Sequence, residues 1–151
     1  MQILVAVLAA LLLVPAVSCR KETDPVHAAL DELASAADDR DADAAGKLLA
    51  TAYADADHSD RIAALQTIRR YFAAYERIST SFSDVKIDRK PDLARATFTA
   101  NFNGAPRKLG SLEGMLPRSA KVKFEMNFVP EDGRWKVAWA AWTLVSEDSG
   151  P

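Results

Sequence analysis

Residues 120–145 read AKVKFEMNFVPEDGRWKVAWAAWTLV. Apolar and polar side chains alternate over residues 120–129, which is typical of a strand with one buried face. Residues 130–133 form a Pro-Glu-Asp-Gly turn whose Gly tolerates a positive φ. The return stretch, residues 134–145, is apolar on both faces, which indicates a strand covered from both sides along part of its length. These residues therefore predict an antiparallel hairpin.

Two further strands are predicted before this hairpin. The alternation begins at Ile78 and changes phase at Ser83-Asp84, where we expect a bulge or bend. Residues 93–103 alternate again, which is typical of a half-buried antiparallel strand. Residues 104–119 are rich in Gly and Pro and predict a long irregular connection.

Three helices are predicted to precede all of these strands. Asp24 followed by Pro25 supplies a capping acceptor and a first-turn proline, so the first helix starts there and ends in residues 38–41. A second helix, capped by Asp41 or Asp43, is expected to stop near Tyr53.

Gly46 weakens that second helix by roughly 1 kcal/mol relative to Ala. Ser59 or Asp60 caps the third helix, which has apolar side chains at helical spacing up to Tyr75. Helices followed by antiparallel strands form the α+β pattern, in which the helices pack on one face of a sheet.

Composition and charge restrict the classes of function that fit this chain. The chain has 151 residues, 49% apolar and 26% charged, with a formal charge of −2, so it fits one globular domain and has no bulk attraction for nucleic acid. Residues 20–60 are mainly acidic and residues 61–136 mainly basic. One group of basic side chains could face anionic headgroups or an acidic partner, or form a solvated face paired with the acidic helices: Arg107, Lys108, Arg118, Lys121 and Lys123.

The N-terminus predicts export. Residues 3–14 are continuously apolar, which is too short for the roughly twenty residues of a membrane span, so residues 1–18 are interpreted as a signal peptide. Residues 16–19, Ala-Val-Ser-Cys, resemble the lipobox of bacterial lipoproteins, in which the Cys is acylated. Cys19 is the only Cys in the chain and has no disulfide partner.

We therefore expect a lipid anchor on Cys19, a tether over residues 19–23, a domain over residues 24–145 and a disordered tail over residues 146–151. The predicted location is periplasmic or extracytoplasmic, on a bacterial membrane. The alternative is a soluble secreted protein cleaved after Ser18, because Ala16 and Ser18 also satisfy the small-residue rule for cleavage.

Motifs for metal, nucleotide or nucleophilic chemistry are missing from the sequence, so no metal and no cofactor are predicted. Residues 55–60, Asp-Ala-Asp-His-Ser-Asp, form the densest polar cluster. The segment is either a cation or acid–base site or a solvated turn that caps the next helix, and the cap is favoured because the segment has no Gly and leads directly into a helix. His27 is interpreted as a surface residue. No carboxylate interrupts the predicted inward faces, so a desolvated general base has no candidate.

The order of elements resembles the nuclear transport factor 2-like superfamily over residues 24–145. The resemblance rests on the Tyr53-Ala54-Asp55 turn, the helix that runs into a bent strand, and the hairpin with GRWKV at residues 133–137 and a late Trp142. It implies a strongly curved sheet wrapped around a helix, forming a cone whose open end is often a pocket. Several relatives are isomerases, cyclases or dehydratases that use a Tyr, His or Asp inside the cone.

The comparable residues of this chain are Tyr53, Tyr71, Tyr75 and His58. Tyr53, Tyr75, Met126 and Trp139 are predicted to line an apolar pocket for a small ligand. The favoured function is therefore a non-catalytic binding or interaction domain. The alternatives are a small-molecule enzyme with Tyr53 or His58 as its polar group, and a protein-protein assembly module that forms a homodimer.

Overall fold

A computed structural model describes residues 23–108 and 116–145. The predicted signal peptide, Cys19 and the tail over residues 146–151 lie outside these residues. The described chain has three helices and five strands, in the order α1 Pro25–Asp38, α2 Ala42–Lys47, β1 Leu49–Asp55, α3 Arg61–Ala73, β2 Tyr75–Arg89, β3 Ala94–Pro106, β4 Ser119–Glu131 and β5 Arg134–Leu144. None of the described helices has the length and apolar character to cross a membrane.

The helices begin where their capping residues predict. The Asp24 carboxylate accepts a hydrogen bond from the Val26 N–H at 2.8 Å, Asp41 caps α2, and Asp60 accepts from the Ala63 N–H at 2.8 Å. Each bond satisfies a backbone donor that the first helical turn leaves free. The predicted starts are confirmed, whereas α3 ends at Ala73 and Tyr75 already begins β2.

The five strands form one sheet in the order β1-β5-β4-β3-β2. Strands β2 to β5 are antiparallel neighbours, as predicted, and the hairpin over residues 119–144 is confirmed. The edge strand β1 runs parallel to β5, with Leu49 opposite Val137. The sheet is therefore mixed, and the prediction of a purely antiparallel sheet is wrong for this strand.

The prediction that three helices precede every strand is also wrong, because β1 lies between α2 and α3. The second helix ends at Lys47 and does not continue to Tyr53. A Cβ on Gly46 would lie 2.7 Å from Leu65 Cδ2, so α2 packs closely under α3 at this glycine. Leu49 then pairs with the apolar strand β5, and this tertiary contact overrides the helical propensity of the Leu- and Ala-rich segment.

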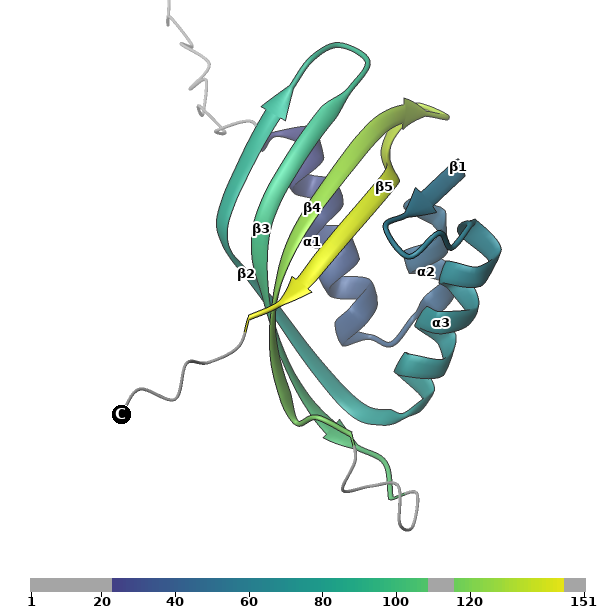
Figure 1. The fold of residues 1–151 in the computed structure, drawn as a ribbon, viewed down its shortest axis with the longest axis vertical. Coiled ribbons are helices and arrows are strands. Elements are labelled where there is room, and N and C mark those ends of the chain that lie inside the picture. The colour runs from purple at the N-terminus through teal and green to yellow at the C-terminus, as the bar shows by residue number, and fades with distance from the viewer. Residues whose placement is uncertain (1–22, 109–115, 146–151) are drawn as a thin grey trace, which may run out of the picture.

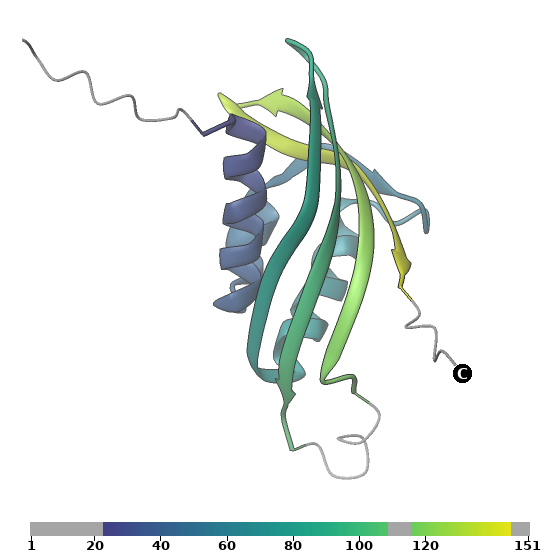
Figure 2. The ribbon, with the colours of Figure 1, turned by 90° about the vertical axis from the view of Figure 1, so that its left-hand side faces the viewer.

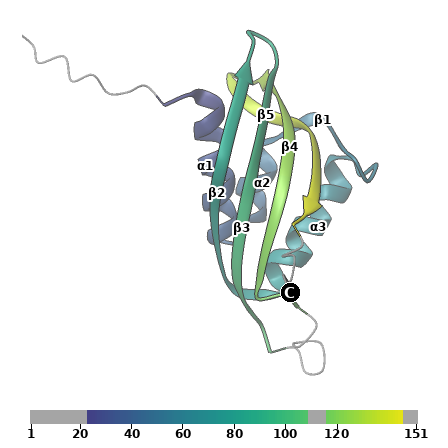
Figure 3. The same cartoon turned by 60° about the vertical axis from the view of Figure 1, so that its left-hand side comes forward.

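The helices all lie on one face of the sheet (Figures 1 and 3). We call this face concave and the opposite face convex, because the long strands curve around the helices (Figure 2). The register shifts between Ser83 and Lys86, where Asp84 has a φ of 54°, and again between Asn127 and Phe128. Bulges of this kind bend a strand and increase its twist. The predicted bend at Ser83-Asp84 is confirmed.

The main core lies between α1 and the concave face. Val26 and Leu30 of α1 belong to one hydrophobic cluster with Phe128 and Val137, and all four side chains are almost completely buried. Small alanines on β3 allow this close packing. Ion pairs join α1 to the sheet at its margin, from Arg134 to Glu32 and from Arg89 to Asp24. Neither pair includes a residue of the basic group named from the sequence.

Candidate functional site

A buried Tyr–Asp pair lies on β1 at the edge of the concave face. Tyr53 and Asp55 are two residues apart on one strand, so both side chains point to the same face, and they are only 7% and 6% exposed. The Tyr53 hydroxyl donates a hydrogen bond to Asp55 Oδ2 at 3.3 Å. Burial raises the pKa of Tyr53, and the negative charge of Asp55 raises it further. Tyr53 therefore stays protonated at neutral pH.

The carboxylate of Asp55 also organises the turn that follows. Its Oδ1 accepts hydrogen bonds from the backbone N–H groups of Asp57 at 3.0 Å and Ser59 at 2.9 Å. Asp60 caps α3, and His58 is exposed with a φ of 62°. The predicted cap on α3 is confirmed at Asp60, whereas Asp55 is buried and is not part of a solvated turn. The described ranges contain no cluster of His, Cys, Asp and Glu that could hold a metal ion.

Asp55 corrects one sequence-based expectation. A carboxylate does face the interior, whereas the sequence pattern predicted none. The sequence pattern predicts a helix that stops near Tyr53 and a solvated turn from Asp55 onward, so it does not place the two side chains on one element. Alternation over residues 53–55 is the signal that reveals the pair, and it can be read only once this segment is recognised as a strand.

Aromatic rings form a row across the concave face. The ring centroids of Phe82 and Phe98 are 4.7 Å apart, those of Phe98 and Phe124 5.4 Å, and those of Phe124 and Trp142 6.2 Å. The row crosses β2, β3, β4 and β5 in that order and ends at Trp142, which is 42% exposed. An exposed indole at the end of a row of aromatic rings offers apolar contact area to a ligand.

The sheet register brings this Trp close to the Tyr–Asp pair. Asp55 lies opposite Ala140, and Ala140 lies opposite Met126, so these side chains share the concave face. Trp142 follows Ala140 by two residues and therefore points to the same face. We call this group the open-edge site: Tyr53, Asp55, Met126, Ala140 and Trp142.

The structure separates the four predicted pocket residues. Tyr53 and Met126 belong to the same hydrophobic cluster. Tyr75 lies at the other end of the sheet, where it stacks on Tyr71 at 5.6 Å and donates a hydrogen bond to the Pro117 carbonyl at 2.8 Å. Burial, together with Tyr71, raises the pKa of Tyr75 to about 12.

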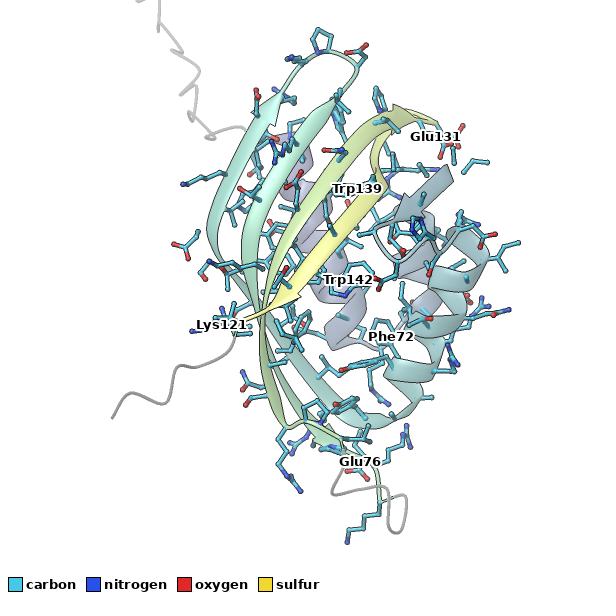
Figure 4. All side chains as sticks on the ribbon, in the orientation of Figure 1. Phe72, Glu76, Lys121, Glu131, Trp139 and Trp142 are labelled. Atoms are coloured by element: carbon cyan, nitrogen blue, oxygen red, sulfur yellow. The ribbon has the colours of Figure 1, made fainter. Side chains whose placement is uncertain are left out.

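Trp139 lies on the convex face. Its register partner is Asn127, the neighbour of the concave residue Met126. Figure 4 shows Trp139 and Trp142 at different heights on β5. The sequence pattern did not distinguish the two because β5 is apolar on both faces, and the bulge opposite Asn127 shifts the alternation.

Shallow hollows in the described part of the chain lie elsewhere, and two of them can be named by their residues. One, of about 170 Å³, lies between α1 and β2 and includes His27, Asp31 and Thr80. The other, of about 290 Å³, lies between the α1–α2 connection and α3 and includes Arg40 and Arg69. Neither is lined by a residue of the open-edge site, in which Tyr53, Asp55 and Ala140 are buried and Trp142 is the exposed member.

The basic residues named from the sequence are all exposed. Lys121 and Lys123 lie on the convex face of β4, opposite Asn101 and Thr99 of β3. Arg107, Lys108 and Arg118 lie at the end of the sheet near the β3–β4 connection. The basic group therefore does not adjoin the open-edge site on the concave face.

Similar folds occur among solved structures, although no protein-family profile matches the sequence and no curated protein is significantly similar to it. A proposed dehydratase of the nuclear transport factor 2-like family from Streptomyces avermitilis is 18% identical, with a TM-score of 0.68 over 81% of this chain and 95% of that one. A proposed scytalone dehydratase from Novosphingobium aromaticivorans is 12% identical, with a TM-score of 0.69 over 81% and 83% of the two chains.

A nuclear transport factor 2-like superfamily protein from Salmonella enterica is 8% identical, with a TM-score of 0.67 over 82% of this chain and 91% of that one. Identities this low carry information about the fold and not about the reaction. Together with the curved five-stranded sheet and the helices on its concave face, these comparisons show that the chain has the nuclear transport factor 2-like α+β fold.

Proposed function

We propose that this chain is an exported, membrane-anchored, non-catalytic domain that binds a small apolar ligand at the open-edge site. The observation that carries the proposal is the state of the polar groups beside Trp142. Both oxygens of Asp55 already accept hydrogen bonds, and the Tyr53 hydroxyl donates its hydrogen bond to one of them. The hydrogen bonds of this pair are made within the protein, so what the site offers a ligand is apolar packing area.

Apolar surface is the property that the site does offer. Trp142 continues the aromatic row outward, and the half-buried Met126 lies on the same concave face beside the buried Ala140. Aromatic and thioether side chains adapt to apolar ligands of varied shape. A flat or elongated apolar molecule that stacks on Trp142 is the ligand class that fits.

Ligand binding is tested by titrating the protein with the fluorescent probe anilinonaphthalene sulfonate. Trp142→Ala is expected to weaken probe binding about tenfold, because it removes the exposed aromatic anchor. Trp139→Ala is the matched control, since it removes the same side chain from the same strand on the convex face. Equal affinities for the two variants would contradict the site. Mass spectrometry of molecules that copurify with the chain then addresses the natural ligand.

An enzyme of the same fold is the competing function. The buried Tyr53–Asp55 pair favours it, and two solved structures with this fold are proposed dehydratases. The Asp55→Asn variant distinguishes the two functions. Its affinity for the probe and its folding stability are both measured and compared with those of the wild type. For a binding domain, this variant is expected to lower stability and to leave the affinity of the folded protein for the probe within about twofold. Turnover of a candidate substrate that disappears in Asp55→Asn would refute the non-catalytic function.

Membrane anchoring is supported by the sequence of residues 1–19 alone. The apolar run and the single Cys19 fit a lipoprotein signal, and two or more acyl chains anchor a protein stably. The full gene is expressed in bacteria with an acyl-chain analogue, and the wild type is compared with Cys19→Ser. Label is expected only on the wild type. Equal labelling of the two chains would remove the anchor and leave a soluble secreted domain.

A further inference from the structure

The two sides of the sheet differ in how their free strand edges are protected. On one side, β2 carries Lys86 and Asp88, contains the bulge at Asp84, and packs against α1. Charges and bulges of this kind prevent a free edge from pairing with another strand. On the other side, β1 covers β5 only as far as Ala140, so the last part of β5 is the edge of the described sheet.

The hydrogen bonds around this segment show which backbone groups face outward. The Ala140 carbonyl accepts from the Ala56 N–H on the β1 side, whereas the Val145 N–H donates to the Lys121 carbonyl on the β4 side. Backbone groups of successive residues in a strand alternate between the two sides. The N–H and C=O groups of Trp142 and Leu144 therefore point away from β4, toward the open edge.

The side chains along this edge provide nothing to prevent pairing. Residues 141–144, Ala-Trp-Thr-Leu, contain no charge, no Pro and no Gly, and they favour extended structure. Leu144 is 70% exposed and Trp142 is 42% exposed, both on the concave side. A neutral, apolar and extended edge is complementary to a copy of itself.

We propose that a second copy of this chain pairs with this edge through its own residues 141–144. The two strands run antiparallel about a two-fold axis at Thr143. Trp142 of one protomer therefore lies opposite the partner's Leu144, and Leu144 of the first protomer lies opposite the partner's Trp142. Each of these two pairs exchanges two backbone hydrogen bonds, because Trp142 and Leu144 are the residues whose backbone groups face outward. The two five-stranded sheets then become one continuous sheet.

Charge is compatible with this register. The nearest basic side chain on the convex face is Lys123, which lies opposite Thr143 on β4. Two copies of Lys123 would lie three strand spacings apart, about 14 Å, which exceeds the Debye length of about 8 Å at physiological salt. Repulsion between the two lysines is therefore weak.

Pairing would also complete the open-edge site. The partner's Leu144 lies beside Trp142 on the concave face and adds an apolar wall on the side where β1 ends. The proposed dimer does not require the proposed ligand. Dimerisation is therefore measured without any ligand or probe. Loss of dimerisation and loss of probe binding are therefore separate outcomes.

A cysteine cross-link tests the register. Thr143→Cys is made in the full chain carrying Cys19→Ser, so that residue 143 holds the only thiol. The two Thr143 residues face each other in a non-hydrogen-bonded pair with Cα atoms about 4.5 Å apart, which is within the range for a disulfide. Mild oxidation is expected to convert most of this variant to a covalent dimer. Ser81→Cys in the same background is the control, because Ser81 is exposed on β2, at the other side of the sheet.

Equal cross-linking of the Thr143→Cys and Ser81→Cys chains would overturn the proposed register. Sedimentation velocity then tests the edge without a new covalent bond. Leu144→Lys is expected to weaken dimerisation at least about tenfold, because each dimer receives the charge twice at its centre. Ile62→Lys is the matched control, since Ile62 is 67% exposed and lies on α3.

Both lysine variants change exposed side chains, so both are expected to fold with the thermal midpoint of the parent chain. A wild-type chain that stays monomeric at hundreds of micromolar would refute the proposal. A dimer weakened equally by Leu144→Lys and Ile62→Lys would also refute it, because the interface would then lie elsewhere.

Discussion

The two halves of the concave face use the same strands in different ways. Under α1, Phe128 and Val137 lie in the same hydrophobic core as Val26 and Leu30, and all four side chains are almost completely buried. Toward the open edge, the aromatic row leaves the core and ends at the exposed Trp142. The difference lies in the covering element, because α1 packs on one half and no described helix buries the end of the other. One half therefore supplies stability, and the other leaves Trp142 exposed, where we propose that a ligand binds.

The largest expected effect is in the sealed half. Phe128→Ala removes a fully buried ring between α1 and the sheet and is expected to lower the free energy of unfolding by about 3 to 5 kcal/mol. Urea denaturation followed by circular dichroism measures the change. A loss below about 1 kcal/mol would mean that α1 does not seal this half.

Asp55→Ala tests the boundary between the two halves. Three hydrogen-bond donors lose their acceptor, namely the Tyr53 hydroxyl and the backbone N–H groups of Asp57 and Ser59. We expect a loss of about 2 to 3 kcal/mol in the free energy of unfolding, measured by the same denaturation. Asp57→Ala is the control, because Asp57 is exposed, and it is expected to change stability by less than about 0.5 kcal/mol.

Gly104→Ala tests the packing at the far end of the sheet. A new Cβ would lie 2.6 Å from the Tyr75 ring, which is stacked on Tyr71 and held by its hydrogen bond to Pro117. Overpacking against a fixed ring is expected to cost about 1 to 2 kcal/mol. Gly133→Ala is the comparison, because its Cβ would meet nothing and only the positive φ of 72° opposes it. Full stability of Gly104→Ala would show that the ring can move.

Alkaline pH tests the buried tyrosines. The folded-state pKa of Tyr53 lies above its ordinary value of 10.0 because of burial and the Asp55 charge, and that of Tyr75 is about 12. The folded state thus holds these protons more tightly than the unfolded state, so their contribution is complete below pH 10 and is lost as the pH rises through the folded pKa values. Tyr53→Phe is expected to cost about 1 kcal/mol near neutral pH and to flatten the decline of stability above pH 10. An unchanged alkaline profile would contradict the burial of Tyr53.

The smallest stability effect is expected at Trp142. The ring is 42% exposed, so Trp142→Ala is expected to change the free energy of unfolding by less than about 1 kcal/mol, measured by urea denaturation. The comparison between the halves is sharpest here, since Phe128→Ala affects folding and Trp142→Ala affects binding. A large loss of stability in Trp142→Ala would place this ring in the core.

Much of the fold follows from local signals in the sequence. The caps at Asp24 and Asp60, the bend at Asp84 and the hairpin over residues 119–144 depend on neighbouring residues, and each was predicted. Strand β1 depends on Val137 and Ala140, which are far away in the sequence, and its Leu- and Ala-rich composition favours a helix. Local periodicity carries no information about such a partner.

The open-edge site was predicted only in part for the same reason. Tyr53 and Met126 were named, and both face the interior. Asp55 was expected in a solvated turn, but it is buried. Trp139 was expected to line the pocket, but it lies on the convex face, and Trp142 is the tryptophan on the concave face. Which tryptophan faces inward depends on a single bulge opposite Asn127, and a shift of one residue reverses the faces of a strand.

The parallel pairing of β1 with β5 also sets an order for assembly. A nascent chain that emerges from its N-terminus presents residues 49–55 long before residues 137–140 are available to pair with them. Contacts between segments so distant in sequence form late and slow the folding of a domain. Until β5 has been synthesised, residues 49–55 lack the strand with which they pair. An unfinished chain would therefore expose these residues to proteases and chaperones, and pairing with β5 completes the fold.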